Sequence, residues 1–219
     1  DITKLPPKVE REAFMETLSE ANKTNDTLDY NWTIYNVDAG GNAFAKKNDD
    51  LRWLQPNSYQ FQNVNQKHPI ANTKVNLLKT RENKDIQPVF YHVFSNQIFP
   101  QEVDLCRFYC NVKPTGAAKM INLVTTLFND YKIPFQYKCL NHPDLYVRSD
   151  SAVLYIDKRN LEIVSIILKL IIREIDSYLV DEIPMFTKQI YKGVGFAEDP
   201  GEGMSFGMSR ATAIASAIG

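Results

Sequence analysis

The segment from Ile133 to Lys158, IPFQYKCLNHPDLYVRSDSAVLYIDK, constrains the fold more than any other part of the chain. Apolar and polar side chains alternate over residues 134–140, and residues 151–156 (SAVLYI) are rich in β-branched and aromatic side chains. Both patterns are typical of β-strands, and the Asn-His-Pro-Asp run at 141–144 breaks the chain between them. The segment therefore predicts two strands of one sheet.

The connector between these strands carries Tyr146, Arg148 and Asp150 at every second position. If residues 146–150 are extended, the three side chains share one face of the chain. Lys138 and Arg148 are then cations on neighbouring strands, beside a phenol and a carboxylate. One interpretation is a solvated sheet face, and the other is a site that binds an anion.

The composition indicates a folded globular protein, because 44% of the 219 residues are hydrophobic and 11% are aromatic. A net charge of −1 and a pI of about 6.4 give no support for a nucleic-acid-binding protein. Residues 107–159 nevertheless hold eight Lys or Arg against four Asp. A local basic region in a nearly neutral chain suits a small anionic group better than a polyanion.

The cysteine and hydropathy patterns point to the cytoplasm. Three cysteines without a dense framework indicate a reducing compartment. Cys106 and Cys110 lie in an apolar strand, so they fit a core role better than a zinc site, and we expect no metal. The sequence has no secretory signal and no apolar run long enough to span a bilayer, so we expect no membrane contact.

The order of predicted elements favours an α+β fold, with helices packed against a mostly antiparallel sheet. We expect strands at 32–37, 87–94, 104–112, 134–140 and 151–157, and helices at 7–23, 116–131 and 161–179. Thr115 is the expected N-cap of the second helix, and the third helix is apolar almost all round, which predicts packing between two layers.

The two ends of the chain are less regular. Residues 42–84 are polar and predict short strands and loops, and residues 184–194 predict a strand or a loop. A Gly- and acid-rich loop at 198–203 leads to Ser205 and a last helix of small residues. We expect an N-terminal region at 1–86 and a second region at 87–219, joined in one continuous globular unit.

No common catalytic signature is present: the sequence lacks a Walker A loop, a dinucleotide fingerprint, a nucleophile elbow and an HExxH motif. What remains is a set of cations near predicted strand ends and turns, with two groups that could handle protons. The cations are Lys113, Lys138, Arg148 and Arg210, and the proton-handling groups are His92 and Tyr155. A lone histidine in an aromatic strand is more often a satisfied core residue than a catalytic one, which is the alternative interpretation of His92. Arg210 is equally read as a surface residue that pairs with Glu198 or Asp199.

Four motifs resemble the HopA-type effector family. They are RFYCNVKP at 107–114, PFQYK at 134–138, YVRSDSAVLYI at 146–156 and GFAEDPGEGMSFGMSR at 195–210. The resemblance covers roughly residues 87–218. Members were first described as bacterial type III secretion effectors, and the same domain is found in biosynthetic clusters for class V lanthipeptides and thioamitides.

The resemblance implies a phosphoserine or phosphothreonine lyase that needs no metal or organic cofactor. A separate kinase-like protein would phosphorylate a precursor peptide, and the HopA-type domain would eliminate the phosphate to leave dehydroalanine or dehydrobutyrine. Similar phosphothreonine lyases carry a Lys-x-His pair on a strand, and here Phe90 stands in the place of that lysine, two residues before His92. Ser209 and Ala211 stand where the family often has His and Cys.

For this reaction we expect Lys138 to act as the base, since neighbouring cations lower the pKa of a lysine. Arg148 and Arg210, supported by Lys113, would hold the phosphate, and His92 and Tyr155 would handle protons. Lys138, Arg148 and Arg210 should then meet in one pocket. The alternative is a non-catalytic protein, either a secreted effector or a peptide- or partner-binding protein, which would dock through its first helix and helix 161–179.

Overall fold

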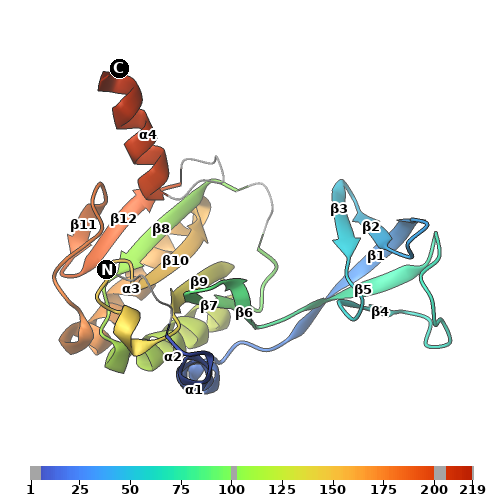
Figure 1. The fold of residues 1–219 in the computed structure, drawn as a ribbon, viewed down its shortest axis with the longest axis horizontal. Coiled ribbons are helices and arrows are strands. Elements are labelled where there is room, and N and C mark those ends of the chain that lie inside the picture. The colour runs from blue at the N-terminus through green and yellow to red at the C-terminus, as the bar shows by residue number, and fades with distance from the viewer. Residues whose placement is uncertain (1–5, 100–102, 200–205, 219) are drawn as a thin grey trace. The chain divides into compact units, whose positions relative to one another are not determined.

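The computed structural model describes residues 6–99, 103–199 and 206–218, and it divides the chain into two compact units. The main unit holds residues 1–24 and 82–219, and the small unit holds residues 25–81. Helix α1 (Lys8–Ala21) therefore belongs to the same unit as the second half of the chain (Figure 1).

The main unit is built on a seven-stranded sheet with the order β11-β12-β8-β10-β9-β7-β6, which Figure 1 shows from one edge to the other. Every neighbouring pair is antiparallel. The strands are β6 (Glu82–Gln87), β7 (Phe90–Phe94), β8 (Leu105–Cys110), β9 (Phe135–Leu140), β10 (Ala152–Asp157), β11 (Lys188–Tyr191) and β12 (Val194–Glu198). The α+β fold class predicted from the sequence is confirmed.

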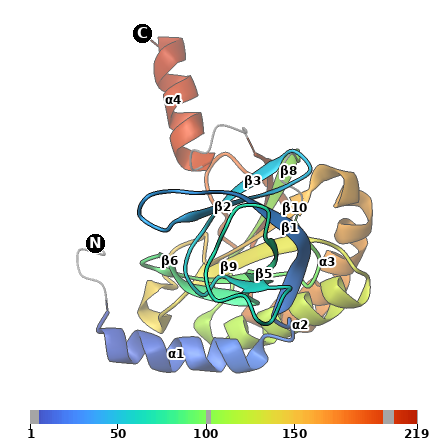
Figure 2. The same ribbon diagram turned by 90° about the vertical axis from the view of Figure 1, so that its right-hand side faces the viewer.

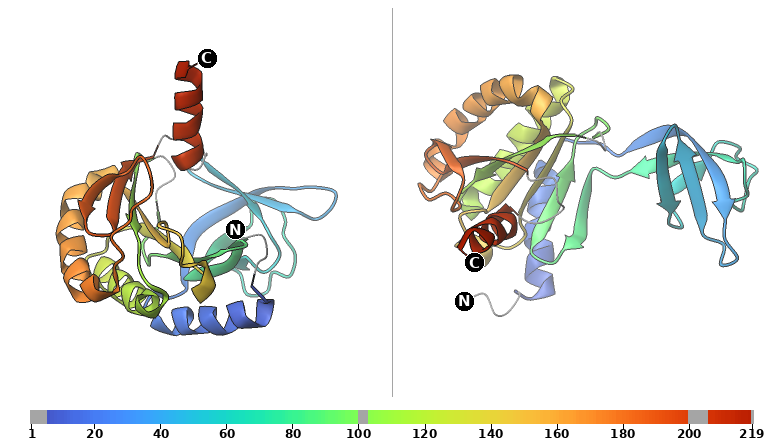
Figure 3. Two further views of the ribbon diagram at one scale, coloured as in Figure 1. Left: turned by 60° about the vertical axis from the view of Figure 1, so that its left-hand side comes forward. Right: turned by 90° about the horizontal axis from the view of Figure 1, so that it is seen from above.

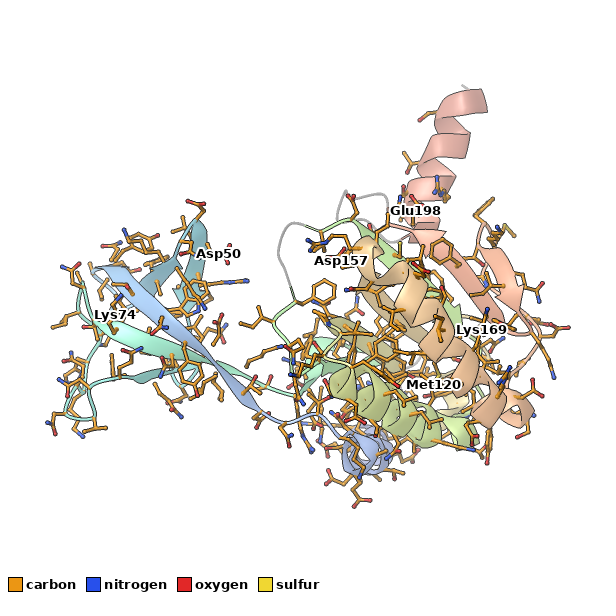
Figure 4. All side chains as sticks on the ribbon, turned by 180° about the vertical axis from the view of Figure 1, so that it is seen from behind. Asp50, Lys74, Met120, Asp157, Lys169 and Glu198 are labelled. Carbon is orange, nitrogen blue, oxygen red and sulfur yellow. The ribbon has the colours of Figure 1, made fainter. Side chains whose placement is uncertain are left out.

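Three helices cover one face of this sheet. They are α1, α2 (Pro114–Asp130) and α3 (Leu161–Ile175), and Figure 2 shows them on the same side of the strands. Their apolar stripes meet alternate strand residues such as Phe108 and Tyr137 in one continuous core. Met120 of α2 is fully buried in that core, whereas Lys169 of α3 is exposed to solvent (Figure 4).

The small unit is a five-stranded antiparallel sheet with the order β3-β2-β1-β5-β4 and no helix of its own, as Figure 3 shows. Its strands are β1 (Thr27–Val37), β2 (Ala43–Lys47), β3 (Asp50–Leu54), β4 (Tyr59–Phe61) and β5 (Lys74–Lys79). Its core is small, with Trp32, Ile34 and Val75 at its centre. Strand β1 starts at Thr27, so the polar stretch before Trp32 is extended as well.

Two predicted boundaries were wrong. The strand expected at 87–94 is split, because β6 ends at Gln87 and a two-residue turn at 88–89 leads into β7. Helix α2 begins at Pro114 with Lys113 at its N-cap, so Thr115 is not the cap. Proline suits the first helical position, because its missing N–H would have no partner there.

Helix α3 does not pack between two layers. One of its faces is buried against the sheet and α2, but Ile163, Ile166 and Leu170 on the other face are 39%, 54% and 44% exposed. Helical structure continues to Tyr178 as the 3-10 helix η3 (Asp176–Tyr178), close to the end predicted from the sequence.

The last helix, α4, spans Phe206–Ile218. Most of the predicted loop at 198–203, together with Ser205, lies outside the described residues. Among the helices that the structure describes, none combines the length and the apolar character needed to cross a bilayer.

Candidate anion-binding pocket

The face of the main sheet that the helices leave open carries the pocket. Side chains alternate along a strand, so the residue next to each core residue of β8, β9 and β10 points to this open face. Backbone pairing places Tyr155 of β10 opposite Arg107 of β8, and Val153 of β10 opposite both Tyr109 of β8 and Lys138 of β9. The register therefore gathers two cations and two phenols on three adjacent strands.

These strand residues form the floor of a pocket of about 330 Å³. Arg148 and Asp150 supply one wall, and the loop before β11 supplies another. The lining residues are Arg107, Tyr109, Lys138, Arg148, Asp150, Val153, Tyr155, Pro184, Met185 and Phe186.

The wall at Arg148 and Asp150 is a turn, and the extended connector expected from the sequence was wrong. The 3-10 helix η1 (Pro143–Leu145) is followed by turns through residue 150, so Tyr146 does not share a face with Arg148. The Tyr146 hydroxyl instead donates to the Leu140 carbonyl at 2.9 Å. Arg148 makes a fork with Asp150, from Nε to Oδ1 at 2.8 Å and from Nη2 to Oδ2 at 2.7 Å.

Arg107 also lines the pocket, and the sequence analysis did not single it out as a candidate site residue. It is 8% exposed, and its Nε donates to Oδ2 of Asp199 at 2.6 Å, with a second bond from Nη2 to the same oxygen. Its guanidinium carbon also lies 5.4 Å from the centre of the Tyr155 ring. The available sequence signal for a site residue was a charged side chain in an otherwise apolar strand, RFYC at 107–110.

Lys138 lies among aromatic rings, where its charge is poorly solvated. Its Nζ is 4.3 Å from the centre of the Phe90 ring and 5.7 Å from that of Tyr155, and it donates to Gln87 Oε1 at 3.1 Å. Burial lowers the pKa of Lys138 to about 8, which the cations Arg107 and Arg148 reinforce and Asp150 opposes. A fraction of this amine is therefore neutral, and able to accept a proton, at physiological pH.

His92 lies directly opposite Lys138 in the pairing of β7 with β9. It does not line the pocket, and its Nε2 is buried without a hydrogen-bond partner. Burial, followed by the charge of Lys138, lowers the pKa of His92 to about 4, so the imidazole is neutral at pH 7. The structure thus brings an amine and an imidazole together from two neighbouring strands.

Tyr155 completes the floor as a hydrogen-bond donor. Burial raises the pKa of Tyr155 to about 12, although the nearby Arg107 opposes this shift. The phenol is therefore protonated at neutral pH and can donate to an oxygen of a bound ligand.

A family model described as the HopA1 effector protein family matches residues 81–218, which contain every residue of the pocket. This chain belongs to the HopA1 effector protein family. A search of curated proteins gave no match.

Two solved structures have a fold similar to that of this HopA1-family chain. The effector protein from Pseudomonas syringae pv. tomato strain DC3000 has a TM-score of 0.54 at 17% identity, over 96% of this chain and 71% of that one. The effector protein from Pseudomonas syringae pv. syringae strain 61 has a TM-score of 0.53 at 19% identity, with the same coverage of both chains. At such low identity the likeness shows the fold alone.

Two of the predicted phosphate-binding residues do not line the pocket of this HopA1-family chain. Lys113 lies at the N-cap of α2, where its Nζ donates to the Ser177 carbonyl at 3.1 Å. Arg210 is exposed on α4. Of the two carboxylates suggested as its partners, Asp199 also pairs with Arg107, and Glu198 pairs with Lys158 at 3.1 Å. The roles of Lys113 and Arg210 stay predictions.

The cysteines of the HopA1-family chain are core residues. Cys106, Cys110 and Cys139 are buried on the helix-covered face of the sheet as free thiols. Over residues 6–99, 103–199 and 206–218, no three His, Cys, Asp or Glu side chains are grouped so that they could hold a metal ion.

Proposed function

We propose that this protein is a lyase that removes phosphate from phosphoserine or phosphothreonine in a peptide. The observation that carries the proposal is the lowered pKa of Lys138 in a pocket that also holds Arg107 and Arg148. A base for the α-proton beside cations for the phosphate is the combination that this elimination requires.

The arginines supply the phosphate site. A guanidinium has five N–H donors, and both Arg107 and Arg148 give Nε and Nη2 to a carboxylate. The carboxylates of Asp199 and Asp150 thus fix the planes of the two forks. Arg107 also has a side-chain hydrogen bond with Tyr109, and the guanidinium donors outside these bonds can meet phosphate oxygens. We assign Arg210 and Lys113 supporting contacts with the same phosphopeptide.

The chemistry then follows from the floor of the pocket. Neutral Lys138 takes the proton from Cα, and the C–H electron pair becomes the double bond between Cα and Cβ. The bond from Cβ to oxygen breaks, and phosphate leaves with that oxygen and both bonding electrons. Tyr155 donates a hydrogen bond to the carbonyl oxygen as negative charge develops on it. Lys138 is left protonated and returns its proton to water.

His92 has a second, later role in this scheme. Its imidazole is neutral at pH 7 and cannot act as an acid there, because its pKa is about 4. A bound phosphate dianion favours the protonated form and raises that pKa. His92 does not line the pocket, so in this scheme its imidazole turns toward Lys138 before it protonates the departing phosphate.

The resemblance to lyases with a Lys-x-His pair supports the assignment of Lys138. Phe90 stands in the place of that lysine, but the Lys138 amine reaches over the Phe90 ring from the neighbouring strand. The amine and His92 are therefore neighbours by strand pairing, although they are not two residues apart in the sequence.

Mass spectrometry of a phosphoserine peptide incubated with the protein tests this function. We expect loss of phosphoric acid with the wild type, and no loss with Lys138→Met. Lys169→Met is the matched control, because Lys169 is exposed on α3 and its substitution should leave the rate unchanged. Equal turnover by wild type and Lys138→Met would remove Lys138 from the mechanism, and no turnover by the wild type on any phosphopeptide would reject the lyase.

A non-catalytic binding role is the second candidate. It is favoured by the carboxylate partners of Arg107 and Arg148, which leave the pocket only weakly positive. The same experiment separates the two functions. A binding protein retains the phosphopeptide through Arg148, but the peptide mass stays unchanged.

The partners follow from the proposed reaction. A lyase needs a kinase-like protein that supplies the phosphorylated precursor peptide, and both proteins would meet in the cytoplasm. For the secreted-effector alternative, the same pocket would meet a phosphoprotein of the host. Pull-down of the purified protein with a kinase-like protein and its peptide tests the first arrangement.

A further inference from the structure

One wall of the pocket differs in character from the rest of it. Pro184, Met185 and Phe186 form an apolar lip on the loop before β11. Met185 is 77% exposed and Phe186 is 50% exposed, yet both line the same pocket as Arg148 and Lys138. The side chains of Met185 and Phe186 provide no strong hydrogen-bonding group, so the lip adds nothing to the recognition of phosphate.

The loop that carries the lip is held against the open face of the sheet. Thr187 follows the lip, and its Oγ1 donates to the Pro184 carbonyl at 2.6 Å. Gly195 of β12 lies beneath it, and a Cβ at this position would come within 2.4 Å of Thr187 Oγ1. The absence of a side chain at Gly195 therefore lets the loop lie close to the strand.

Phe186 is held in an unfavourable backbone conformation. Its φ is +68°, in the left-handed region that bulky residues avoid. Among the described residues, the other non-glycine positions with positive φ are four asparagines and Lys132. Strain at a bulky residue persists only where the surrounding structure imposes it, and such residues cluster at ligand-binding sites.

We propose that Met185 and Phe186 form a subsite for an apolar side chain within two residues of the phosphorylated residue. This subsite rests on the proposed function, because it needs a phosphopeptide in the pocket. Arg107 and Arg148 line the same pocket as the lip, so a peptide whose phosphate they hold would run beside the lip. An extended peptide advances about 3.3 Å per residue, so a side chain one or two residues from the phosphorylated residue can reach the lip while the peptide stays extended. A leucine or similar side chain would cover the exposed parts of both residues.

The test compares five phosphoserine peptides in direct binding. One has alanine at all flanking positions, and the other four each carry a single leucine at one of the positions from −2 to +2. We expect at least one leucine peptide to bind about tenfold more tightly, which corresponds to about 1.4 kcal/mol. Met185→Ser and Phe186→Asn should each reduce that gain, and asparagine accommodates the left-handed backbone, so the loop should keep its shape.

Ile190→Ser is the matched control. Ile190 is 36% exposed on β11 of the same hairpin but does not line the pocket, so its substitution should leave the preference intact. Equal affinity for all five peptides, or a leucine preference that survives in both lip variants, would overturn the subsite. If binding depends on Arg148 but shows no leucine preference, only the subsite fails. If no phosphopeptide binds, or if Arg148→Gln leaves the affinity for every phosphopeptide unchanged, the proposed function fails together with the subsite.

Discussion

The pH dependence of elimination is the most direct consequence of the Lys138 environment. With a pKa of about 8, the neutral fraction of Lys138 is about one half at pH 8, a tenth at pH 7 and a hundredth at pH 6. Phosphoserine is a dianion above its second pKa of about 6. Between pH 6.5 and 7.5 we therefore expect kcat/KM to rise nearly tenfold per pH unit, and to level off above pH 8.

Two charge-removing variants should move this profile in opposite directions. Asp150 raises the pKa of Lys138, so Asp150→Asn should shift the midpoint to lower pH. Arg148 lowers that pKa, so Arg148→Gln should shift the midpoint upward. A unit charge several ångströms away in a partly solvated site changes a pKa by on the order of half a unit. Both variants also break the fork between Arg148 and Asp150, so we expect a higher KM for each. A higher KM lowers the whole pH profile and leaves its midpoint unchanged.

A phosphate-release assay under first-order conditions measures the profile, with peptide concentrations well below KM. Lys169→Met should reproduce the wild-type curve, since Lys169 lies on α3 outside the pocket. A rate that is flat or falls between pH 6.5 and 8 would refute Lys138 as the base. A midpoint that moves the same way in Asp150→Asn and Arg148→Gln would refute the electrostatic account of its pKa.

Three further predictions concern binding and stability. Arg107→Gln should weaken phosphopeptide binding by about thirtyfold in calorimetry. The double variant Arg107→Gln with Asp199→Asn tests whether part of the loss comes from the buried Asp199 carboxylate that no longer pairs with Arg107. Lys138→Met should raise Tm at pH 7, because the folded state disfavours the charged amine of Lys138. This gain in Tm should fade as the pH rises from about 8 toward 10.5, where the amine becomes neutral in both states, and a gain that grows with pH would contradict the prediction. Gly116→Ala should lower the free energy of unfolding in urea by about 1–3 kcal/mol, because its Cβ would lie 2.5 Å from that of Tyr178, and an unchanged midpoint would contradict it.

The sheet of the main unit was predictable where the alternation of residues is strong. Residues 134–140 and 151–157 became β9 and β10, because each strand buries one face against helices and leaves the other open. The turn at 88–89 was missed because β-branched and aromatic residues follow Pro88 without a break, although Pro88 lacks the N–H that a central strand position needs. The prediction that helix α3 packs between two layers was wrong because three of its apolar side chains are exposed. Exposure cannot be predicted from residue type alone.

The site was predictable only in part, because it depends on which strands are neighbours. Lys138, Arg148 and Tyr155 come from one short segment, and they do line one pocket. Arg107 and the apolar lip could not be placed from the sequence, because the pairing of β8 with β10 and β12 joins segments far apart in the chain. Local patterns determine strands, whereas strand order comes from the tertiary packing that buries them.

The described part of the motif at 195–210 acts on the pocket in a way that the sequence alone does not suggest. Gly195 gives room for Thr187 and so for the loop that carries the apolar lip, while Asp199 holds the plane of the Arg107 guanidinium. Neither residue lines the pocket itself. A substitution at either position should therefore alter the walls of the pocket while leaving the Lys138 amine in place. Changes in kcat/KM with an unshifted pH midpoint would be the signature of residues that position the site, since the pKa of Lys138 depends mainly on its own burial.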